Sequence, residues 1–395
     1  MNYTRKLPER EKNPETCCPS VKEGKIYKNP WPSATWRKST YKGLLARRIY
    51  GYFTSSIFGR EKNQQLKVDL DFEAINNYHN DDKNIAMQLI WLGHAAFLLQ
   101  INSFTILFDP MLSKRASPLN FIGPYRCRNR GFQKFSQLPP IDFVILSHNH
   151  YDHLDKWTIQ EIYAEEKNKK AKVLCPLDLK PMFLSLGIPE NQIIECDWWD
   201  DIEVTRIPES IDVNDEKALQ ESLTSPSNRK IIISAVPSQH FSGRTGFDFN
   251  ETLWAGWVVK SQEASYYFAG DTGYRSLPDD CPKEDIEKYP YCPVFKQIGN
   301  IYGPFDMASI PIGPFTPVNR MSRIHTNAND AVNLHTDCKS KHSILMHWGT
   351  LENLGVDEIE RGPDELHKEL IKKNIPLDEF HEVYIGQILK IEKKK

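Results

Sequence analysis

Residues 147–155 read SHNHYDHLD and directly follow the apolar run at residues 143–146. Four potential metal ligands therefore fall within six residues: His148, His150, Asp152 and His153. Core packing has no use for such a cluster, because unpaired imidazoles and a carboxylate are costly to remove from water. A bound metal ion gives each of these side chains a partner. The spacing predicts a metal site at the end of a buried strand.

Three further predicted strands are each followed by one more candidate ligand: His240, Asp271 and His347. In α/β sheets, ligand sites lie at the carboxyl ends of strands. Four strand ends can therefore converge on one place. Together with the first cluster, these residues complete a plausible set for two metal ions.

From about residue 86 onward the chain reads as α/β. Short apolar runs predict strands at 87–92, 104–108, 143–146, 173–174, 231–236, 266–269 and 344–346. We expect helices at 156–168, 177–187, 328–337 and 363–373. The polar stretches 210–229 and 277–293 are expected to be surface loops. One catalytic domain, residues 86–395, would follow an N-terminal extension, residues 1–85.

The extension divides into two parts. Residues 1 to about 40 are polar and rich in Pro and Lys, and we expect them to be loosely ordered, with Trp31 docking along a groove. Residues 41–59 place their apolar side chains on one helical face: Leu45, Ile49, Tyr52, Phe53 and Ile57. This pattern is typical of a helix that lies in a membrane interface, and equally of one packed on the catalytic core.

Composition excludes several classes of protein. Lys plus Arg number 50 against 52 for Asp plus Glu, so no global field attracts nucleic acid. The eight cysteines are scattered without a CxxC pair, which argues against a zinc ribbon, and no secretory signal supports a disulfide framework. The apolar runs are too short for a membrane span. We expect a protein that faces the cytosol, either free or resting on a membrane surface.

These motifs together resemble the metallo-β-lactamase superfamily, which implies an αββα sandwich. The flanking motifs are more specific: WLGHA at 91–95, Asp109-Pro110, PSQH at 237–240, GDTG at 270–273 and HWGT at 347–350. With SHNHYDHLD they resemble the family of phospholipases D that hydrolyse N-acyl-phosphatidylethanolamine. The resemblance runs from about residue 28 to about residue 355.

The resemblance implies two zinc ions per chain. One would be held by His148, His150 and His240. The other would be held by Asp152, His153 and His347, with Asp271 bridging both. A hydroxide shared by the two ions would attack phosphorus and release an N-acylethanolamine and phosphatidic acid.

The resemblance also assigns roles around the metals. Asp152 and Asp271 would act in catalysis as well as ligation. His325 would give a proton to the leaving group or a hydrogen bond to the phosphate, although a surface histidine in a polar loop is an equal alternative. His94 is expected to be a structural turn residue, and Asp109 an outer hydrogen-bond partner of the metal loop.

The expected substrate contacts are Asn120, Phe121 and Gln239. Members of the resembled family carry Gln-Tyr where this chain has Asn120 and Phe121, so acyl-chain or headgroup preference is expected to differ.

The family further implies a membrane phospholipid as substrate, a homodimer, and a peripheral position on the cytosolic face of endomembranes such as Golgi or endosome. Two alternatives stay open at this point. Another hydrolase of the same fold, a lactonase or an RNA nuclease, is one, although a nuclease usually shows a basic stripe that we do not find. The other is a non-catalytic zinc-binding scaffold, although structural zinc sites are usually closed and rich in cysteine.

Overall fold

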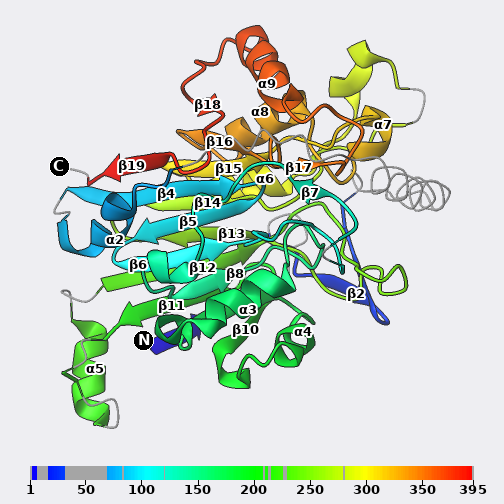
Figure 1. Cartoon of the computed structure of the whole chain (residues 1–395). Coiled ribbons are helices and arrows are strands. Elements are labelled where there is room, and N and C mark those ends of the chain that lie inside the picture. Colours follow the sequence, from blue (N-terminus) through cyan, green and yellow to red (C-terminus); the bar gives the residue numbers. More distant parts are fainter. Residues whose placement is uncertain are drawn as a thin grey trace.

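The computed structural model describes residues 2–6, 17–31, 69–81, 84–119, 121–207, 210–211, 215–225, 229–278 and 281–393. In this part of the chain, two large sheets pack face to face and helices cover their outer faces (Figure 1). Rings from the two sheets meet between them: Phe108 lies 4.9 Å from Phe268, and Phe97 lies 6.2 Å from the same ring. The expected αββα sandwich is confirmed.

The larger sheet has eight strands in the order β1(Asn2–Lys6), β11(Asp201–Arg206), β12(Arg229–Val236), β13(Gly256–Lys260), β14(Ser265–Phe268), β15(Met307–Pro311), β16(Ser343–Met346) and β18(Phe380–His381). Neighbours are antiparallel from β1 to β14 and parallel from β14 to β18. The carboxyl ends of β12, β14 and β16 therefore point to the same edge of the sheet.

The smaller sheet has seven strands in the order β10(Ile193–Cys196), β9(Lys172–Pro176), β8(Phe143–Ile145), β6(Phe104–Phe108), β5(Ala96–Ile101), β4(Ile85–Gly93) and β19(Ile388–Glu392). β5, β6 and β8 are buried on both faces, which explains why their sequences are mostly apolar rather than alternating, with Gln100 and Thr105 as the polar exceptions. Two short ribbons complete the strands: β2(Val21–Glu23) with β3(Ile26–Lys28), and β7(Tyr125–Arg126) with β17(Leu351–Glu352).

Helices lie outside both sheets (Figure 1). Against the smaller sheet pack α2(Phe72–Asp81), α3(Lys156–Ala164) and α4(Lys180–Ser185). Against the larger sheet pack α6(Val294–Ile301), α8(Ala328–Asp337) and α9(Arg361–Lys372), while α5(Glu216–Thr224) and α7(Val318–Met321) lie in connections. Short 3-10 turns occupy Phe135–Gln137, Glu166–Asn168, Glu190–Gln192 and Lys283–Lys288.

The predicted strands are all present, and helix 328–337 is confirmed to the residue as α8. The predicted helix at 156–168 is divided into α3 and the turn Glu166–Asn168. The expectation of a simple loop at 210–229 is wrong, because that stretch contains α5. Asp215 starts this helix, and its carboxylate accepts hydrogen bonds from the backbone N–H groups of Lys217 and Ala218.

The expectation that residues 1 to about 40 are loosely ordered is likewise wrong for the part of them that the structure describes, residues 2–6 and 17–31. β1 adds an antiparallel edge strand to the larger sheet by pairing with β11. Trp31 is buried and stacks on Trp198 with ring centroids 5.3 Å apart, so its predicted docking is confirmed. The amphipathic stretch 41–59 lies outside the described residues.

None of the helices in the described part of the chain combines the length and apolar content needed to cross a bilayer.

Candidate metal centre

All seven predicted ligands lie together at one edge of the sandwich. The histidine-rich loop 147–155 leaves the end of β8, in the smaller sheet. The other three ligands follow β12, β14 and β16 of the larger sheet: His240, Asp271 and His347. Every one of the seven residues is buried. The convergence predicted from the strand ends is therefore confirmed.

Asp271 stands between the histidines. Its Oδ2 lies 3.2 Å from His153 Nε2, 3.6 Å from His240 Nε2 and 4.0 Å from His148 Nε2. Its Oδ1 lies 3.2 Å from His347 Nε2. The two carboxylate oxygens of Asp271 therefore face different histidines. This is the arrangement that a residue needs in order to bind two ions at once.

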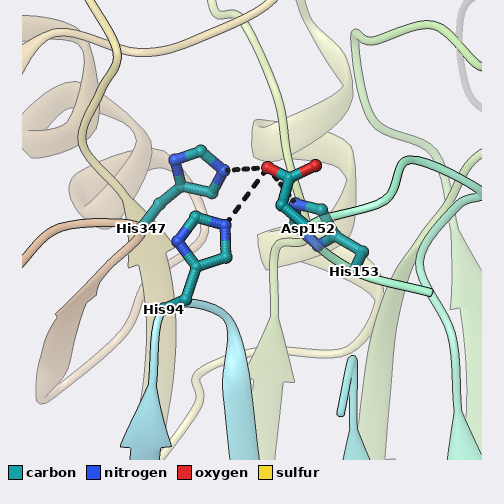
Figure 2. A group of neighbouring side chains, drawn as sticks. All are labelled: His94, Asp152, His153 and His347. Atoms are coloured by element: carbon teal, nitrogen blue, oxygen red, sulfur yellow. Dashed lines mark hydrogen bonds and ion pairs between the residues drawn. The ribbon is translucent and has the colours of Figure 1, made fainter. Parts of the chain in front are cut away.

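Four overlapping groups of possible ligands have all their atoms within 4.8 Å of one another. Two have three members each, Asp109 with His148 and His153, and Asp271 with His325 and His347; the other two, the first and second groups, have four members each. The first group is His148, His150, His240 and Asp271. The second group is His94, Asp152, His153 and His347. Figure 2 shows the second group, in which His94 and His347 both reach one oxygen of Asp152, at 3.2 and 3.5 Å. Three of its members were predicted as ligands, and His94 was not.

Several buried atoms of the centre make no hydrogen bond of good geometry: both oxygens of Asp271, Nε2 of His153 and Nε2 of His347. Such atoms are costly to leave unsatisfied in the interior of a protein. They converge from both sheets on one small volume, and imidazole and carboxylate are ordinary ligands for zinc and related ions. The residues present therefore fit a metal centre.

The electrostatics of the centre agree with this. Burial would raise the pKa of Asp271, but His153 and His347 beside it hold that pKa well below its ordinary value. Burial would also raise the pKa of Asp152, and its imidazole neighbours, His153 first, outweigh that effect. Burial, helped by the surrounding histidines, keeps the pKa of His148 well below its usual range. A lowered pKa favours the ionised carboxylate, which is the form that binds a divalent cation.

Hydrogen bonds from outside the centre fix several ligands. Asp109 accepts from the N–H of Ser147 at 2.7 Å, and its Oδ2 lies 2.6 Å from His153 Nδ1. The hydroxyl of Ser147 lies 2.8 Å from His148 Nδ1. The carbonyl of Ile324 accepts from His240 Nδ1 at 2.8 Å. The predicted outer role of Asp109 is confirmed, because it orients His153 and the start of the metal loop.

His325 belongs to the centre and is not a surface residue. Its side chain is buried, and Nδ1 lies 3.8 Å from Asp271 Oδ2. The ring lies 5.2 Å from the rings of both His240 and His347. Its backbone N–H donates to Met321 at the end of α7. The structure thus brings His325 beside the ligands.

Gln239 links segments of the centre to one another. It is fully buried, and its side-chain amide donates to the carbonyl of Arg323 at 3.1 Å. Its carbonyl accepts from the N–H of Gly273 at 2.7 Å. These contacts join the loops that carry His240, Asp271 and His325. A direct contact between Gln239 and substrate stays a prediction.

The two other expected substrate contacts lie in the loop between Arg115 and Tyr125, which pair through an isolated bridge. Phe121 is 69% exposed in this loop. Asn120 lies outside the described residues. A small cavity of about 50 Å³ lies beside the second group. It is lined by His94, Ile312, Phe315, His347, Trp348 and Leu354, among others.

Sequence reasoning missed two residues that hold the ligand loops. The guanidinium of Arg244 donates to the carbonyls of Asn149 and Leu154, at 2.6 and 2.9 Å, and lies over the ring of Tyr151. The side-chain amide of Asn29 donates to the carbonyl of His240 at 2.8 Å. Neither residue carries a sequence signal, because each acts over a long separation in the chain.

Comparison with known proteins places the chain in a family. Residues 105–348 match the model of the beta-lactamase superfamily domain. The N-acyl-phosphatidylethanolamine-hydrolyzing phospholipase D 1 of Caenorhabditis elegans is 30% identical over 93% of each chain. The mitochondrial N-acyl-phosphatidylethanolamine-hydrolyzing phospholipase D of Saccharomyces cerevisiae is 25% identical over 73% of this chain and 54% of its own.

Among solved structures, the isothiocyanate hydrolase from Delia radicum gut bacteria superposes with a TM-score of 0.52 at 15% identity. The match covers 77% of this chain and 99% of that one, and it supports the fold. With the metal-binding groups described above, these findings agree on one family. This chain is a metal-dependent hydrolase of the metallo-β-lactamase superfamily and belongs to its family of N-acyl-phosphatidylethanolamine-hydrolysing phospholipases D.

Proposed function

We propose that this chain is a zinc-dependent phosphodiesterase that hydrolyses N-acyl-phosphatidylethanolamine to an N-acylethanolamine and phosphatidic acid. The observation that carries the proposal is the pair of buried ligand groups joined by Asp271. The relative from C. elegans, which aligns along nearly the whole chain, is named for this reaction. The reaction itself is extended to this chain as our inference.

Two zinc ions would divide the ligands as the two groups suggest. His148, His150 and His240 would hold one ion, and Asp152, His153 and His347 the other, with Asp271 shared. When bound, such a pair of ions neutralises phosphate charge and makes a nucleophile available at neutral pH. The centre contains histidine and aspartate and no cysteine among the described ligand groups, which favours an open catalytic site over a closed structural one.

The remaining steps fall to the side chains of this protein. In the hydrolysis, the bond between phosphorus and the ethanolamide oxygen breaks, and a proton must reach the departing oxygen. His325 is our candidate for that proton, or for a hydrogen bond to a phosphate oxygen, because its ring lies beside Asp271 and His347. Asp152 would orient the nucleophile in addition to binding metal.

The proposal includes a membrane as the source of the substrate. Large apolar side chains stand exposed on two loops connected to the centre: Leu119 at 48%, Phe121 at 69% and Phe247 at 95%. Phe247 lies in the loop after His240, and β7, which follows the loop of Phe121, pairs with β17 beyond His347. Exposed aromatic and aliphatic groups beside a lipid-cleaving centre favour contact with a bilayer. A peripheral position on the cytosolic face of endomembranes and a homodimer are part of the same proposal.

The direct test is mass spectrometry of the purified protein with N-acyl-phosphatidylethanolamine vesicles, with and without chelator. Asp271→Asn serves as the inactive variant, and Asp364→Asn, an exposed position on α9, as its matched control. We expect release of both products that is lost with chelator and with Asp271→Asn, and retained with Asp364→Asn. A protein that holds metal yet releases neither product would refute the lipid assignment and turn attention to lactones and RNA.

A further inference from the structure

His94 lies inside the metal centre without belonging to the predicted ligand set. It stands in the tight turn between β4 and β5, and its side chain is 1% exposed. Its Nε2 lies 3.2 Å from Asp152 Oδ2, and its ring centroid lies 4.0 Å from that of His347 (Figure 2). One side chain thus contacts two members of the second group.

The chemistry of the partner decides which way the hydrogen bond runs. A carboxylate that binds a metal ion offers only acceptor lone pairs, and His94 Nε2 lies within hydrogen-bond distance of this one. Nε2 of His94 must therefore carry the hydrogen and donate it to Asp152. In that tautomer Nε2 has no free lone pair, so His94 acts on the carboxylate and not on a metal ion.

The backbone of the turn is strained for a histidine. His94 has φ of 57°, in the left-handed region that a glycine adopts without cost. If this position served the turn alone, glycine would suit it better. Strain of this kind is found at sites where the side chain has a function.

Three hydrogen bonds hold His94 in that conformation. Its N–H donates to Thr350 Oγ1 at 2.8 Å. Its carbonyl accepts from the backbone N–H of His347 at 3.2 Å and from Trp91 Nε1 at 2.9 Å. The turn is thereby tied to the backbone of His347, and the imidazole ring is aimed at Asp152.

His347 needs such support. Its Nδ1 is buried and has no hydrogen-bond partner among the described residues, in contrast to the outer nitrogens of His148, His153 and His240. The carbonyl and the ring of His94 are the contacts that take the place of an outer hydrogen bond.

We infer that His94 is a positioning residue of the second metal group, which holds the carboxylate of Asp152 through Nε2 and presents His347 through its carbonyl and ring. This inference rests on the part of the proposed function that assigns two metal ions to the centre. It does not depend on which substrate the enzyme hydrolyses.

The test compares His94→Gly with His94→Gln. Glycine removes the side chain and relieves the strained backbone. Glutamine restores an N–H donor at a similar distance from the main chain. Lys339→Gly is the matched control, because Lys339 also has a positive φ, 58°, but is exposed on the surface away from the centre. The readouts are metal content, affinity for each ion in competition with a chromophoric chelator, and thermal stability of the metal-free protein.

We expect His94→Gly to lower the affinity for the ion of the second group by about 10- to 100-fold, which is the usual effect of losing an outer hydrogen-bond partner. The ion of the first group should stay bound. The metal-free form of this variant should be at least as stable as the wild type. His94→Gln should recover most of the lost affinity, and Lys339→Gly should leave both ions unaffected.

Wild-type affinity in His94→Gly would overturn the inference. So would a metal-free His94→Gly that is much less stable than the wild type, since His94 would then serve the fold. If His94→Gln did not restore the metal affinity lost in His94→Gly, this result would also overturn the inference and would indicate that the His94 ring binds a metal ion directly. A wild-type protein that binds fewer than two ions would refute the two-metal part of the proposed function before any variant is measured.

Discussion

The two ligand groups of the centre differ in how the protein holds them. In the first group, the outer nitrogens of His148 and His240 are hydrogen-bonded to Ser147 and to the carbonyl of Ile324. In the second group, His153 is fixed by Asp109, but Nδ1 of His347 has no partner among the described residues. Outer hydrogen bonds fix ring orientation and raise the basicity of a ligand. Two histidines of the first group and one of the second are held in this way.

This difference teaches that some ligands of a metal centre are held by local contacts and others by contacts across the fold. Ser147 is adjacent to His148, and Asp109 ends the neighbouring strand β6 of the same sheet. Asp152 and His347, by contrast, follow strands of different sheets, and the turn at His94 contacts both of them. The predictions below separate the two groups.

Removing the metal should have the largest effect. When the free metal concentration is 100 times the dissociation constant, one bound ion adds about 2.7 kcal/mol to the free energy of unfolding, so two ions add about 5 kcal/mol together. We expect a chelator titration to proceed in two steps, with the ion of the second group lost first, and activity to vanish. Metal analysis at each step and thermal unfolding check this. Simultaneous loss of both ions would show that the two groups do not differ.

Asp271→Asn should come next, because the Asp271 carboxylate faces histidines of both groups. The amide keeps the shape but removes the charge. We expect weaker binding of both ions and an activity lower by more than about 100-fold, beyond the range typical of an outer partner. Metal content and product release measure this. A variant that loses only one ion would contradict the shared role.

Asp109→Asn and Ser147→Ala should affect different groups. Asp109→Asn weakens the partner of His153, so the second ion should bind about 10- to 100-fold less tightly. Ser147→Ala removes the hydroxyl beside His148 and should lower the affinity for the ion of the first group by about tenfold. Separate affinities for the two ions, measured by competition, decide the matter. Equal losses at both sites in both variants would mean that the groups are coupled as one unit.

Asn29→Ala should have the smallest effect. It removes one hydrogen bond to the carbonyl of His240, worth about 1 kcal/mol. We expect the first ion to bind several-fold less tightly and the second ion to be unchanged. Isothermal titration of the metal-free variant tests this. A change at the second ion instead would show that the N-terminal segment acts on the centre by another route.

The sequence alone predicted the central features of the fold. The run from Phe104 to Phe108 is mostly apolar and forms the buried strand β6, and the helix predicted at 328–337 is α8. The features that it did not predict depend on distant partners. β1 is polar and forms a strand only because β11 offers it a free edge, and α5 depends on a cap at Asp215 in a stretch too polar to show a helical face.

The ligand set was determined by the sequence itself, because His148, His150, Asp152 and His153 are crowded onto one loop, and unpaired they would be too costly to bury. The tertiary structure alone decided the places of His94, His325 and Gln239. Each of these is a single polar residue in a turn or loop, and its role depends on the distant residues that folding places next to it. For His94 that partner is Asp152, 58 positions further along the chain.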